Sequence, residues 1–454
     1  MGGSCGLIVL ANCVDSADVS ESAPPMVEEN APPAGVRQHG TPPRKKRDRL
    51  LIFSQVFVPD PASVGQHVAD VAIEMARRGF KVRVYTANRG YDDPTRKYPA
   101  REILHGVEVI RLPLSSFGKK TILTRVIGTA SFMVQAFVRG LLLPNVAGVM
   151  VSTSPPLIGA VSTVLRMFRG MPMAYWAMDL NPDQLLAMNK IKPGGFVARF
   201  LEAVNRTILN NSALVIALDR FMADRLLPRA RVSKTMAIIP PWPHEDVIEP
   251  LEHDQNDFRK KHGLDGKFVV MYSGNHSPSN PLTTVLDAAV RLKDDDTVKF
   301  LFVGGGNGKK EVEQYLKTHA LPHVISLPYQ PLETLRYSLS AADVHVVSMG
   351  DNMVGIIHPC KVYGAMAVGR PVLYVGPRPS HIADLLDQED FGRAVRHGDV
   401  DGCVAAIKSL QEMTTDQWRA MGVRGQTLLA GRLSQEILCG RFCDGLELTF
   451  EKRM

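Results

Sequence analysis

Residues 50–87 read LLIFSQVFVPDPASVGQHVADVAIEMARRGFKVRVYTA, and no other stretch indicates the fold class so clearly. The apolar opening, residues 50–57, predicts a buried strand, and the prolines that follow it predict a loop. The next segment is apolar at a helical spacing, at Val68, Val71, Ala72 and Met75. Residues 81–87 then predict a second strand. A strand, a helix and a strand in this order form a βαβ unit, which implies a parallel sheet with a right-handed crossover.

The same alternation continues along the first half of the chain. Further strands are expected at residues 107–112, 148–152, 173–177 and 214–218. Helices are expected between these strands, including one at residues 197–209. The prolines between Pro240 and Pro243 stiffen the chain, and a polar stretch up to Lys261 follows them. We therefore place a linker here.

A second alternation follows the linker. Its strands are expected at residues 267–273, 299–303, 323–327, 344–348 and 371–375. Its helices are expected at residues 281–292, 309–318 and 362–368. The sequence therefore predicts an α/β fold with two Rossmann-like, doubly wound parallel-sheet domains that face each other across a cleft. Because such sheets bind ligands at the carboxyl ends of their strands, we look for chemistry in the loops that follow strands.

Four segments are expected along the chain. Residues 1–49 are rich in Pro, Glu, Ser and Ala, a composition that predicts a disordered arm. Residues 50–240 form the first domain and residues 241–430 the second, and residues 431–454 form a C-terminal helical tail. The length of 454 residues agrees with two domains, because one hydrophobic core rarely grows so large.

The composition limits the function only loosely. A net charge of +7 suits phosphorylated ligands, nucleic acid or an anionic membrane. No recognisable motif for reading nucleic acid is present, so we do not expect a nucleic-acid partner. The six cysteines form no CxxC pair and do not cluster with histidines, so no metal site is expected. No apolar run reaches the length of a membrane span.

Two glycine loops follow strands of the second domain. Gly274 and Asn275 follow the first strand, and Gly304 and Gly305 follow the second. Glycine allows the backbone to approach a phosphate closely, and a helix N-terminus offers free N–H groups. Each loop could equally be a plain tight turn, and the spacing is not that of a nicotinamide site.

The segment from Gly355 to Lys361 combines a loop, a cation and the start of a helix. The backbone of this segment, which includes Gly355, Ile356 and Pro359, and the ammonium group of Lys361 could together bind a phosphate. The alternative is that Lys361 is a solvated residue of the first helical turn.

Three further residues are candidates. Asp179 follows a strand of the first domain, where a carboxylate can orient a substrate hydroxyl, although it could also hold its own loop. Gly65 in the first loop would let a diphosphate approach. Tyr329 could stack on a nucleobase or fill the core.

Taken together, these motifs resemble the retaining family 4 glycosyltransferases of the GT-B fold. The resemblance is strongest to the branch that builds bacterial surface polysaccharides, of the colanic-acid and O-antigen type. It runs from about residue 50 to residue 430, and the ordered set of motifs carries it. The motifs are residues 50–65, 179–182, 272–275, 302–306, 327–331, 341–344 and 359–372.

The resemblance implies a retaining hexosyl or deoxyhexosyl transfer from a nucleotide-sugar donor to a glycan or lipid-linked acceptor. It implies that the second domain binds the donor, through the loops of Gly274 and Gly304 and the segment from Gly355 to Lys361, and that the first domain binds the acceptor. It also places Asp179 near a catalytic position of the family. A catalytic role for Lys361 is our own hypothesis and does not come from the resemblance. No cofactor or metal is expected. Many family members carry two glutamates eight positions apart, where this chain has Ile356 and Gly364. An Arg and Lys pair is also missing after Gly274, and Lys361 could replace it.

Two alternatives stay open at this point. One is a pseudo-glycosyltransferase that binds a nucleotide sugar without turnover, and the other is a nucleotide-sugar 2-epimerase, which shares the fold. Residues 117–143 are apolar and basic, which suits either a helix on an anionic membrane or a buried crossover helix. The expected location is the cytoplasm, with peripheral binding to the inner face of the cell membrane.

Overall fold

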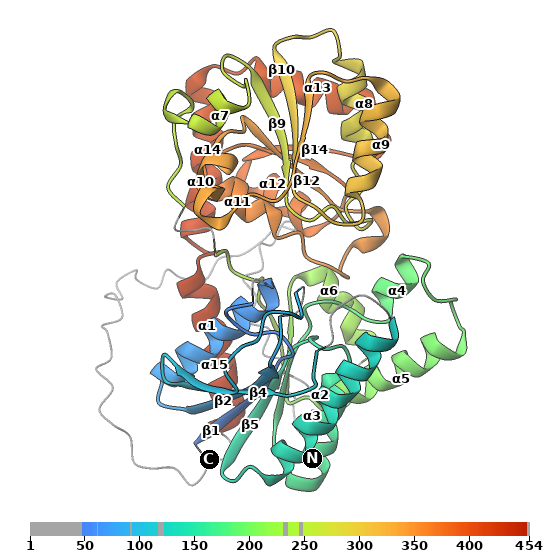
Figure 1. Ribbon diagram of the computed structural model, residues 1–454, viewed down its shortest axis with the longest axis vertical. Helices are drawn as coiled ribbons and strands as arrows, with labels where there is room; N and C mark the ends of the chain where they lie inside the picture. Colours follow the sequence, from blue (N-terminus) through green and yellow to red (C-terminus); the bar gives the residue numbers. More distant parts are fainter. Residues whose placement is uncertain are drawn as a thin grey trace, which may run out of the picture.

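The computed structural model describes residues 48–60, 62–90, 93–116, 122–229, 235–244 and 248–451. The chain forms two α/β domains stacked along the long axis of the molecule (Figure 1). Of the expected disordered arm, only Asp48 and Arg49 lie within the described residues. Arg49 already belongs to the first strand, so the expected end of the arm is too late by one residue.

The first domain contains an eight-stranded sheet in the order β3-β4-β2-β1-β5-β6-β7-β8. Its strands are parallel except for β3, which pairs with β4 in the antiparallel sense. The bounds are β1 Arg49–Phe53, β2 Lys81–Ala87, β3 Arg101–Leu104, β4 Val107–Leu112, β5 Val146–Val151, β6 Met173–Trp176, β7 Leu214–Ala217 and β8 Thr235–Ile238.

The first strand is shorter than the expected residues 50–57. It ends at Phe53, because the chain turns at Ser54, whose hydroxyl donates a 2.7 Å hydrogen bond to the carbonyl of Val56. The apolar residues Val56 and Phe57 that follow are buried in the loop. The apolar run at residues 50–57 therefore extends beyond the end of β1, the strand that we expected it to form.

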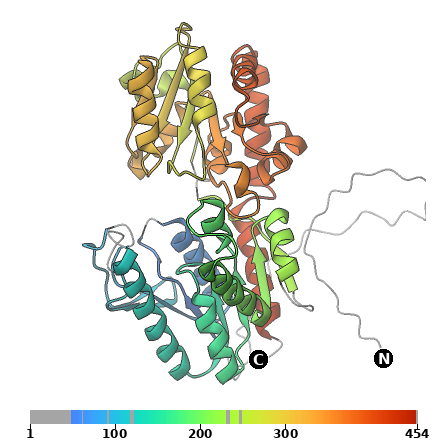
Figure 2. The ribbon, with the colours of Figure 1, turned by 90° about the vertical axis from the view of Figure 1, so that its right-hand side faces the viewer.

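Helices cover both faces of the first sheet (Figures 1 and 2). Helices α1 (Ser63–Arg77) and α15 (Gln435–Glu451) pack together on one face. Helices α2 (Ile122–Leu142), α3 (Ile158–Arg169) and α5 (Phe196–Asn211) form a layer on the other, with α3 in contact with both neighbours. The short helices are α4 Asp183–Ala187, α6 Arg220–Leu226 and η1 Leu227–Arg229.

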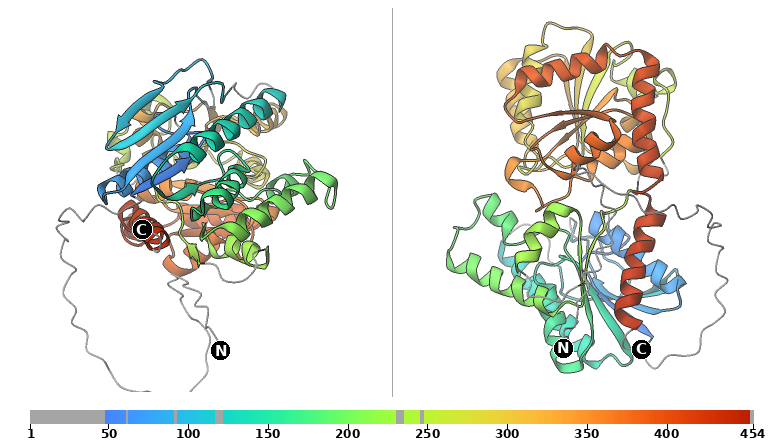
Figure 3. Two further views of the ribbon diagram at one scale, coloured as in Figure 1. Left: turned by 90° about the horizontal axis from the view of Figure 1, so that it is seen from below. Right: turned by 180° about the vertical axis from the view of Figure 1, so that it is seen from behind.

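The C-terminal helix returns to the first domain. Helix α14 (Thr415–Ala430) lies on the second domain, and α15 runs back beside α1 (Figure 3). The ring of Phe442 lies 4.5 Å from that of Trp176 and 6.1 Å from that of Trp242. The segment expected as a helical tail thus contributes to the core of the first domain, and its last residues, 452–454, lie outside the described residues.

The second domain contains a six-stranded parallel sheet in the order β11-β10-β9-β12-β13-β14. Its strands are β9 Phe268–Ser273, β10 Val298–Val303, β11 Val324–Leu327, β12 Val344–Ser348, β13 Val372–Val375 and β14 Gly392–Val395. Its other helices are η2 His253–Gln255, α7 Asp257–Lys261, α8 Thr283–Arg291, α9 Lys309–His319, η3 Leu332–Thr334, α10 Leu335–Ser340, η4 Asp351–Met353, α11 Lys361–Ala367, α12 His381–Glu389 and α13 Val400–Gln411.

Candidate active site

The two domains meet where sequence motifs from both were expected to act. The backbone N–H of Leu180 donates a 3.2 Å hydrogen bond to the carbonyl of Ile356. A Cβ on Gly355 would lie 2.5 Å from the carbonyl oxygen of Phe221 in α6, so these backbones touch. The loop after Asp179 and the loop before Lys361 are therefore in direct contact, although they are far apart in the sequence.

Lys361 is the first residue of α11 and lies over the first glycine loop. Its Cε would be 2.9 Å from a Cβ on Gly274, and its Nζ lies 5.4 Å from the centre of the Tyr272 ring. In the amide orientation that satisfies both ends of Asn280, Oδ1 accepts a 3.2 Å hydrogen bond from Lys361 Nζ. Burial lowers the pKa of Lys361, so an anion beside it would favour the charged form.

The loops after β9 and β10 lie side by side. Gly274 has φ +127° and Gly304 has φ +128°, conformations that L side chains rarely adopt. A Cβ on Gly304 would lie 2.0 Å from the carbonyl oxygen of Gly274, and one on Gly306 would lie 2.2 Å from Oδ1 of Asn275. These glycines are required by the close approach of the two loops.

Tyr329 follows β11 and borders the same group of loops. Its ring would lie 3.0 Å from a Cβ on Gly305, and its hydroxyl donates a 3.4 Å hydrogen bond to the carbonyl of Gly305. The ring is 58% exposed, which leaves it available to a ligand and excludes the alternative that it fills the core. Pro359 is buried just before α11.

Two residues without a predicted role complete this region. Lys309 Nζ donates hydrogen bonds to the carbonyls of Phe302 (3.0 Å) and Leu327 (2.8 Å), at the ends of β10 and β11. Burial, together with the charge of Lys309, lowers the pKa of His276 to about 4, so its ring is neutral. Its Nε2 is buried and finds no hydrogen-bond partner among the residues that the structure describes.

The family models match both domains. Residues 63–242 match the family described as "Glycosyl transferase 4-like domain", and residues 267–413 match "Glycosyl transferases group 1". This chain is a glycosyltransferase. The glycosyltransferase is 25% identical over 383 residues to a protein of Escherichia coli K12 named as the colanic acid biosynthesis glycosyl transferase WcaI, which covers 79% of this chain and 91% of that protein. It is 23% identical over 244 residues to WbjE of Pseudomonas aeruginosa, named as a glycosyltransferase, covering 54% of this chain and 61% of that protein.

Solved structures confirm the predicted fold class. Sucrose-phosphate synthase from Thermosynechococcus elongatus superposes with a TM-score of 0.71 at 18% identity, covering 89% of this chain and 100% of that chain. Anabaena HepE in complex with UDP-glucose gives a TM-score of 0.65 at 15% identity, covering 88% of this chain and 99% of that chain. The glycosyltransferase therefore has the GT-B fold of two Rossmann-like domains.

Asp179 lies on the first-domain side of the boundary in this glycosyltransferase. Its backbone N–H donates a 3.3 Å hydrogen bond to Thr153 Oγ1, and the residue keeps part of its surface exposed. Burial raises the pKa of its carboxyl group to about 6, because removal from solvent disfavours the charged form. A carboxylate with this pKa can accept a hydrogen bond from a hydroxyl at neutral pH.

A histidine and an aspartate form a second contact across the boundary of the glycosyltransferase. His358 Nδ1 lies 3.5 Å from a carboxylate oxygen of Asp219, and its Nε2 lies 2.9 Å from the hydroxyl of Tyr363. Asp219 also caps α6 by accepting a 2.9 Å hydrogen bond from the N–H of Met222. His358 stands in the predicted phosphate motif, but no local pattern indicates a partner 139 residues away.

Gly65 lies within α1 of the glycosyltransferase and not in the loop before it. The space beside it is filled by the backbone of Val56 and Phe57, with Phe57 N only 3.1 Å from a Cβ on Gly65. Packing within the first domain thus accounts for this glycine, and contact with a donor stays a prediction.

Ile356 and Gly364, which occupy the positions where many family members carry glutamates, have apolar surroundings. Ile356 is only 2% exposed, and its carbonyl oxygen accepts the hydrogen bond from Leu180. A Cβ on Gly364 would lie 3.5 Å from the side chain of Leu339. Neither position offers a carboxylate to a donor.

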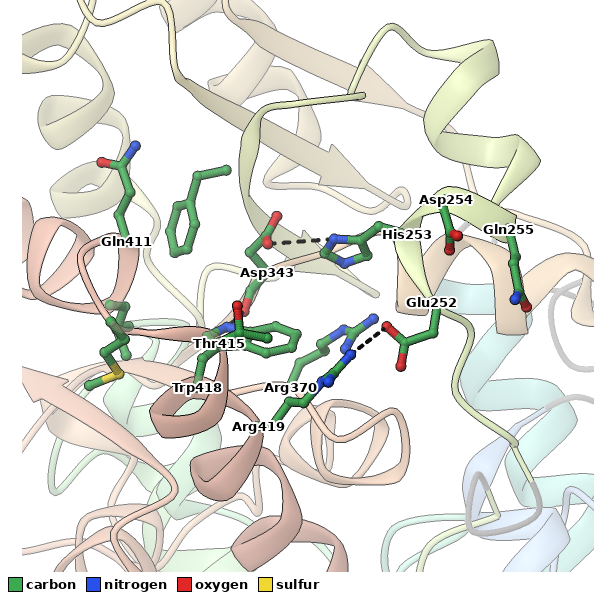
Figure 4. A pocket seen from close by; sticks show the side chains of 13 residues that line it. Glu252, His253, Asp254, Gln255, Asp343, Arg370, Gln411, Thr415, Trp418 and Arg419 are labelled. Carbon is green, nitrogen blue, oxygen red and sulfur yellow. Dashed lines mark hydrogen bonds and ion pairs between the residues drawn. The ribbon is translucent and has the colours of Figure 1, made fainter.

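A cavity of about 630 Å³ lies elsewhere in the second domain of the glycosyltransferase, between η2 and α14 (Figure 4). At this cavity His253 Nδ1 lies 3.7 Å from a carboxylate oxygen of Asp343, and Arg419 forms a 3.4 Å ion pair with Glu252. None of the predicted site residues lines this cavity. Among the described residues, no group of three His, Cys, Asp or Glu side chains is arranged to hold a metal ion.

Proposed function

We propose that this glycosyltransferase moves a sugar from a nucleotide-sugar donor to a glycan or lipid-linked acceptor in polysaccharide biosynthesis, with retention of configuration. The similarity to a protein named for colanic acid biosynthesis supports the pathway class. The UDP-glucose in the HepE structure, which has the same fold, supports a nucleotide-sugar donor. Retention follows from the resemblance to family 4 enzymes.

The observation that carries the proposal is the gathering of the second-domain loops around Lys361. The loops after β9 and β10 touch through Gly274 and Gly304, and Lys361 lies directly over Gly274. Backbone N–H groups, glycines without side chains and an ammonium group are the features that bind a diphosphate. As the glycosidic bond breaks, the same groups stabilise the charge that develops on the leaving nucleoside diphosphate.

The remaining predicted residues surround this centre. Tyr329 offers an exposed ring for the nucleobase, and Asn275 and Gly305 belong to the two touching loops. Lys309 adds a second cation near the ends of β10 and β11. We propose that these groups bind the donor without a metal ion, so EDTA should leave transfer intact.

The acceptor is proposed to bind on the first-domain side. The contact between Leu180 and Ile356 brings the loop of Asp179 against the donor loop. The carboxylate of Asp179 would accept a hydrogen bond from the acceptor hydroxyl and orient its oxygen toward the sugar. Contact between the domains would exclude water and limit hydrolysis of the donor.

The proposed site of action is the cytoplasmic face of the cell membrane, where lipid-linked acceptors are found. None of the helices in the described residues combines the length and hydropathy that a bilayer crossing requires. A peripheral contact is therefore the form of membrane binding that we propose.

The test is to incubate the protein with a panel of nucleotide sugars and extracts of lipid-linked glycans. Release of nucleoside diphosphate that depends on an acceptor supports transfer, and NMR of the product anomer tests retention. An isomerised donor without acceptor would indicate the epimerase, and donor binding without release would indicate the pseudo-enzyme.

A further inference from the structure

Helix α2 is apolar on the side that faces solvent as well as on the side that faces the protein. Its buried side is formed by residues at every fourth position, including Phe132 and Ala136, which are fully buried. Its outer side carries Leu123, Ile127, Val134, Val138 and Leu141, with exposed fractions from 37% to 68%. A surface helix normally places polar residues there, and a helix that is apolar all round is usually covered.

The apolar surface continues over the two neighbouring helices. On α3, Met167 is 77% exposed and Phe168 is 71% exposed. On α5, Phe196 is 85% exposed and Phe200 is 53% exposed. Since α3 packs against both α2 and α5, the outer sides of the three helices adjoin, as Figure 2 shows from that side. We call this surface the outer apolar face. Exposed apolar side chains gathered on adjoining helices are typical of contact sites.

Arginine predominates among the charged residues of the three helices, which carry Arg125, Arg139, Arg166, Arg169, Arg199 and Arg206 and one carboxylate, Glu202. Residues 109–178 contain no Asp or Glu and seven Lys or Arg. Arg125 on α2 and Arg199 on α5 are exposed beside the apolar side chains. Apolar side chains bordered by cations match a bilayer surface with anionic headgroups. A second copy of the chain is less suitable, because symmetric pairing would bring arginines of like charge together.

We infer that the outer apolar face docks on an anionic lipid bilayer. The side chains of α2, α3 and α5 enter the boundary between headgroups and acyl chains, and the arginines contact lipid phosphates. The inference rests on the proposed function, because the role of docking is to hold the first domain beside a lipid-linked acceptor. The membrane contact that the sequence suggested for residues 117–143 is thereby extended to helices α2, α3 and α5. Residues 117–121 lie outside the described residues.

The experiment is cosedimentation of the full chain with vesicles of phosphatidylcholine, with and without phosphatidylglycerol. An apolar variant carries Val134→Ser, Met167→Ser and Phe196→Ser, and a charge variant carries Arg125→Gln and Arg199→Gln. A matched control carries Ile103→Ser, Val423→Ser and Leu448→Ser, which are also more than half exposed but lie outside the three helices. Melting temperatures without lipid verify that all variants fold.

The wild type and the control are expected to sediment with the anionic vesicles at low salt. The apolar and charge variants should bind these vesicles about tenfold more weakly, since each loses one of the two contributions. Equal binding by wild type and apolar variant, or equal binding to both vesicle types, would overturn the inference. A wild-type dimer that the apolar variant lacks would assign the face to a second copy instead. Thermal stabilisation by a nucleotide sugar reports the proposed function separately, without vesicles.

Discussion

The side chain of Lys361 lies directly across Gly274, so that a Cβ on residue 274 would be 2.9 Å from Lys361 Cε. The same glycine has φ +127°, which a residue with a side chain adopts only under strain. Gly274 therefore determines both the path of the loop after β9 and the position of the ammonium group. A change at residue 274 should act on the donor site through Lys361.

Substituting Gly274→Ala should weaken donor binding about tenfold or more, because the new methyl group displaces Lys361 from the loops that it covers. Binding is measured by calorimetry with the donor that the panel identifies. Gly266→Ala is the matched control, since Gly266 also has positive φ (+68°) but no atom lies within 4 Å of its Cβ position. Equal losses in both variants would mean that backbone strain alone explains the effect.

Gly355→Ala should lower the rate of transfer about tenfold or more by forcing the domains apart at α6. The added Cβ would lie 2.5 Å from the carbonyl oxygen of Phe221, across the domain boundary. Small-angle scattering should show a larger radius of gyration for this variant. Gly398→Ala, at φ +83° in open surroundings, should change neither quantity. An unchanged radius of gyration in Gly355→Ala would contradict the account.

Asp179→Asn should stabilise the protein at neutral and alkaline pH while lowering transfer. The folded-state pKa is about 6, above the ordinary value of 3.8, so ionisation of the buried carboxyl group costs stability. This cost is absent below about pH 4, grows as the pH rises to about 6, and is complete above it. Removing the charge should raise the free energy of unfolding at pH 8 by up to about 3 kcal/mol.

Urea unfolding of wild type and Asp179→Asn at pH 8 and pH 4 measures this difference. The stabilisation should vanish at the lower pH, while transfer at pH 8 falls about tenfold to a hundredfold because the oxygen that orients the acceptor loses its charge. A variant with wild-type activity would exclude Asp179 from the acceptor site.

Phe442→Ala should destabilise the first domain by about 3–5 kcal/mol, although the residue is 12 positions from the end of the chain. Its ring is fully buried against Trp176 and Trp242. Leu448→Ala on the same helix is the control, since Leu448 is 57% exposed and should cost less than about 1 kcal/mol. Similar costs for both would mean that α15 does not complete this core.

The sequence was sufficient to predict the exact bounds of three strands. Strands β2, β4 and β12 have the expected bounds, and each contains three β-branched residues, the type that favours strands. Strands β3, β8 and β14 were not predicted. Each has only four residues, and Ile103 in β3 is 75% exposed, so a continuous apolar signal is missing.

The contacts between the domains could not be predicted from the sequence. The pattern placed Asp179 after a strand and the loop from Gly355 to Lys361 before a helix, and the structure brings these two loops together. The pairing of Asp219 with His358 and the return of α15 to the first domain depend on how the domains pack. Local sequence periodicity does not predict such packing, because the packing depends on surfaces formed by residues that are distant in the chain.

The most direct test of the donor site is thermal unfolding with a panel of nucleotide sugars, using wild type, Lys361→Ala and Lys310→Ala. Lys310 is exposed on α9 and serves as the control for loss of one positive charge. We predict that one nucleotide sugar raises the melting temperature of wild type and of Lys310→Ala but not of Lys361→Ala. A panel without any stabilising nucleotide sugar, or equal stabilisation of Lys361→Ala, would contradict the proposed donor site.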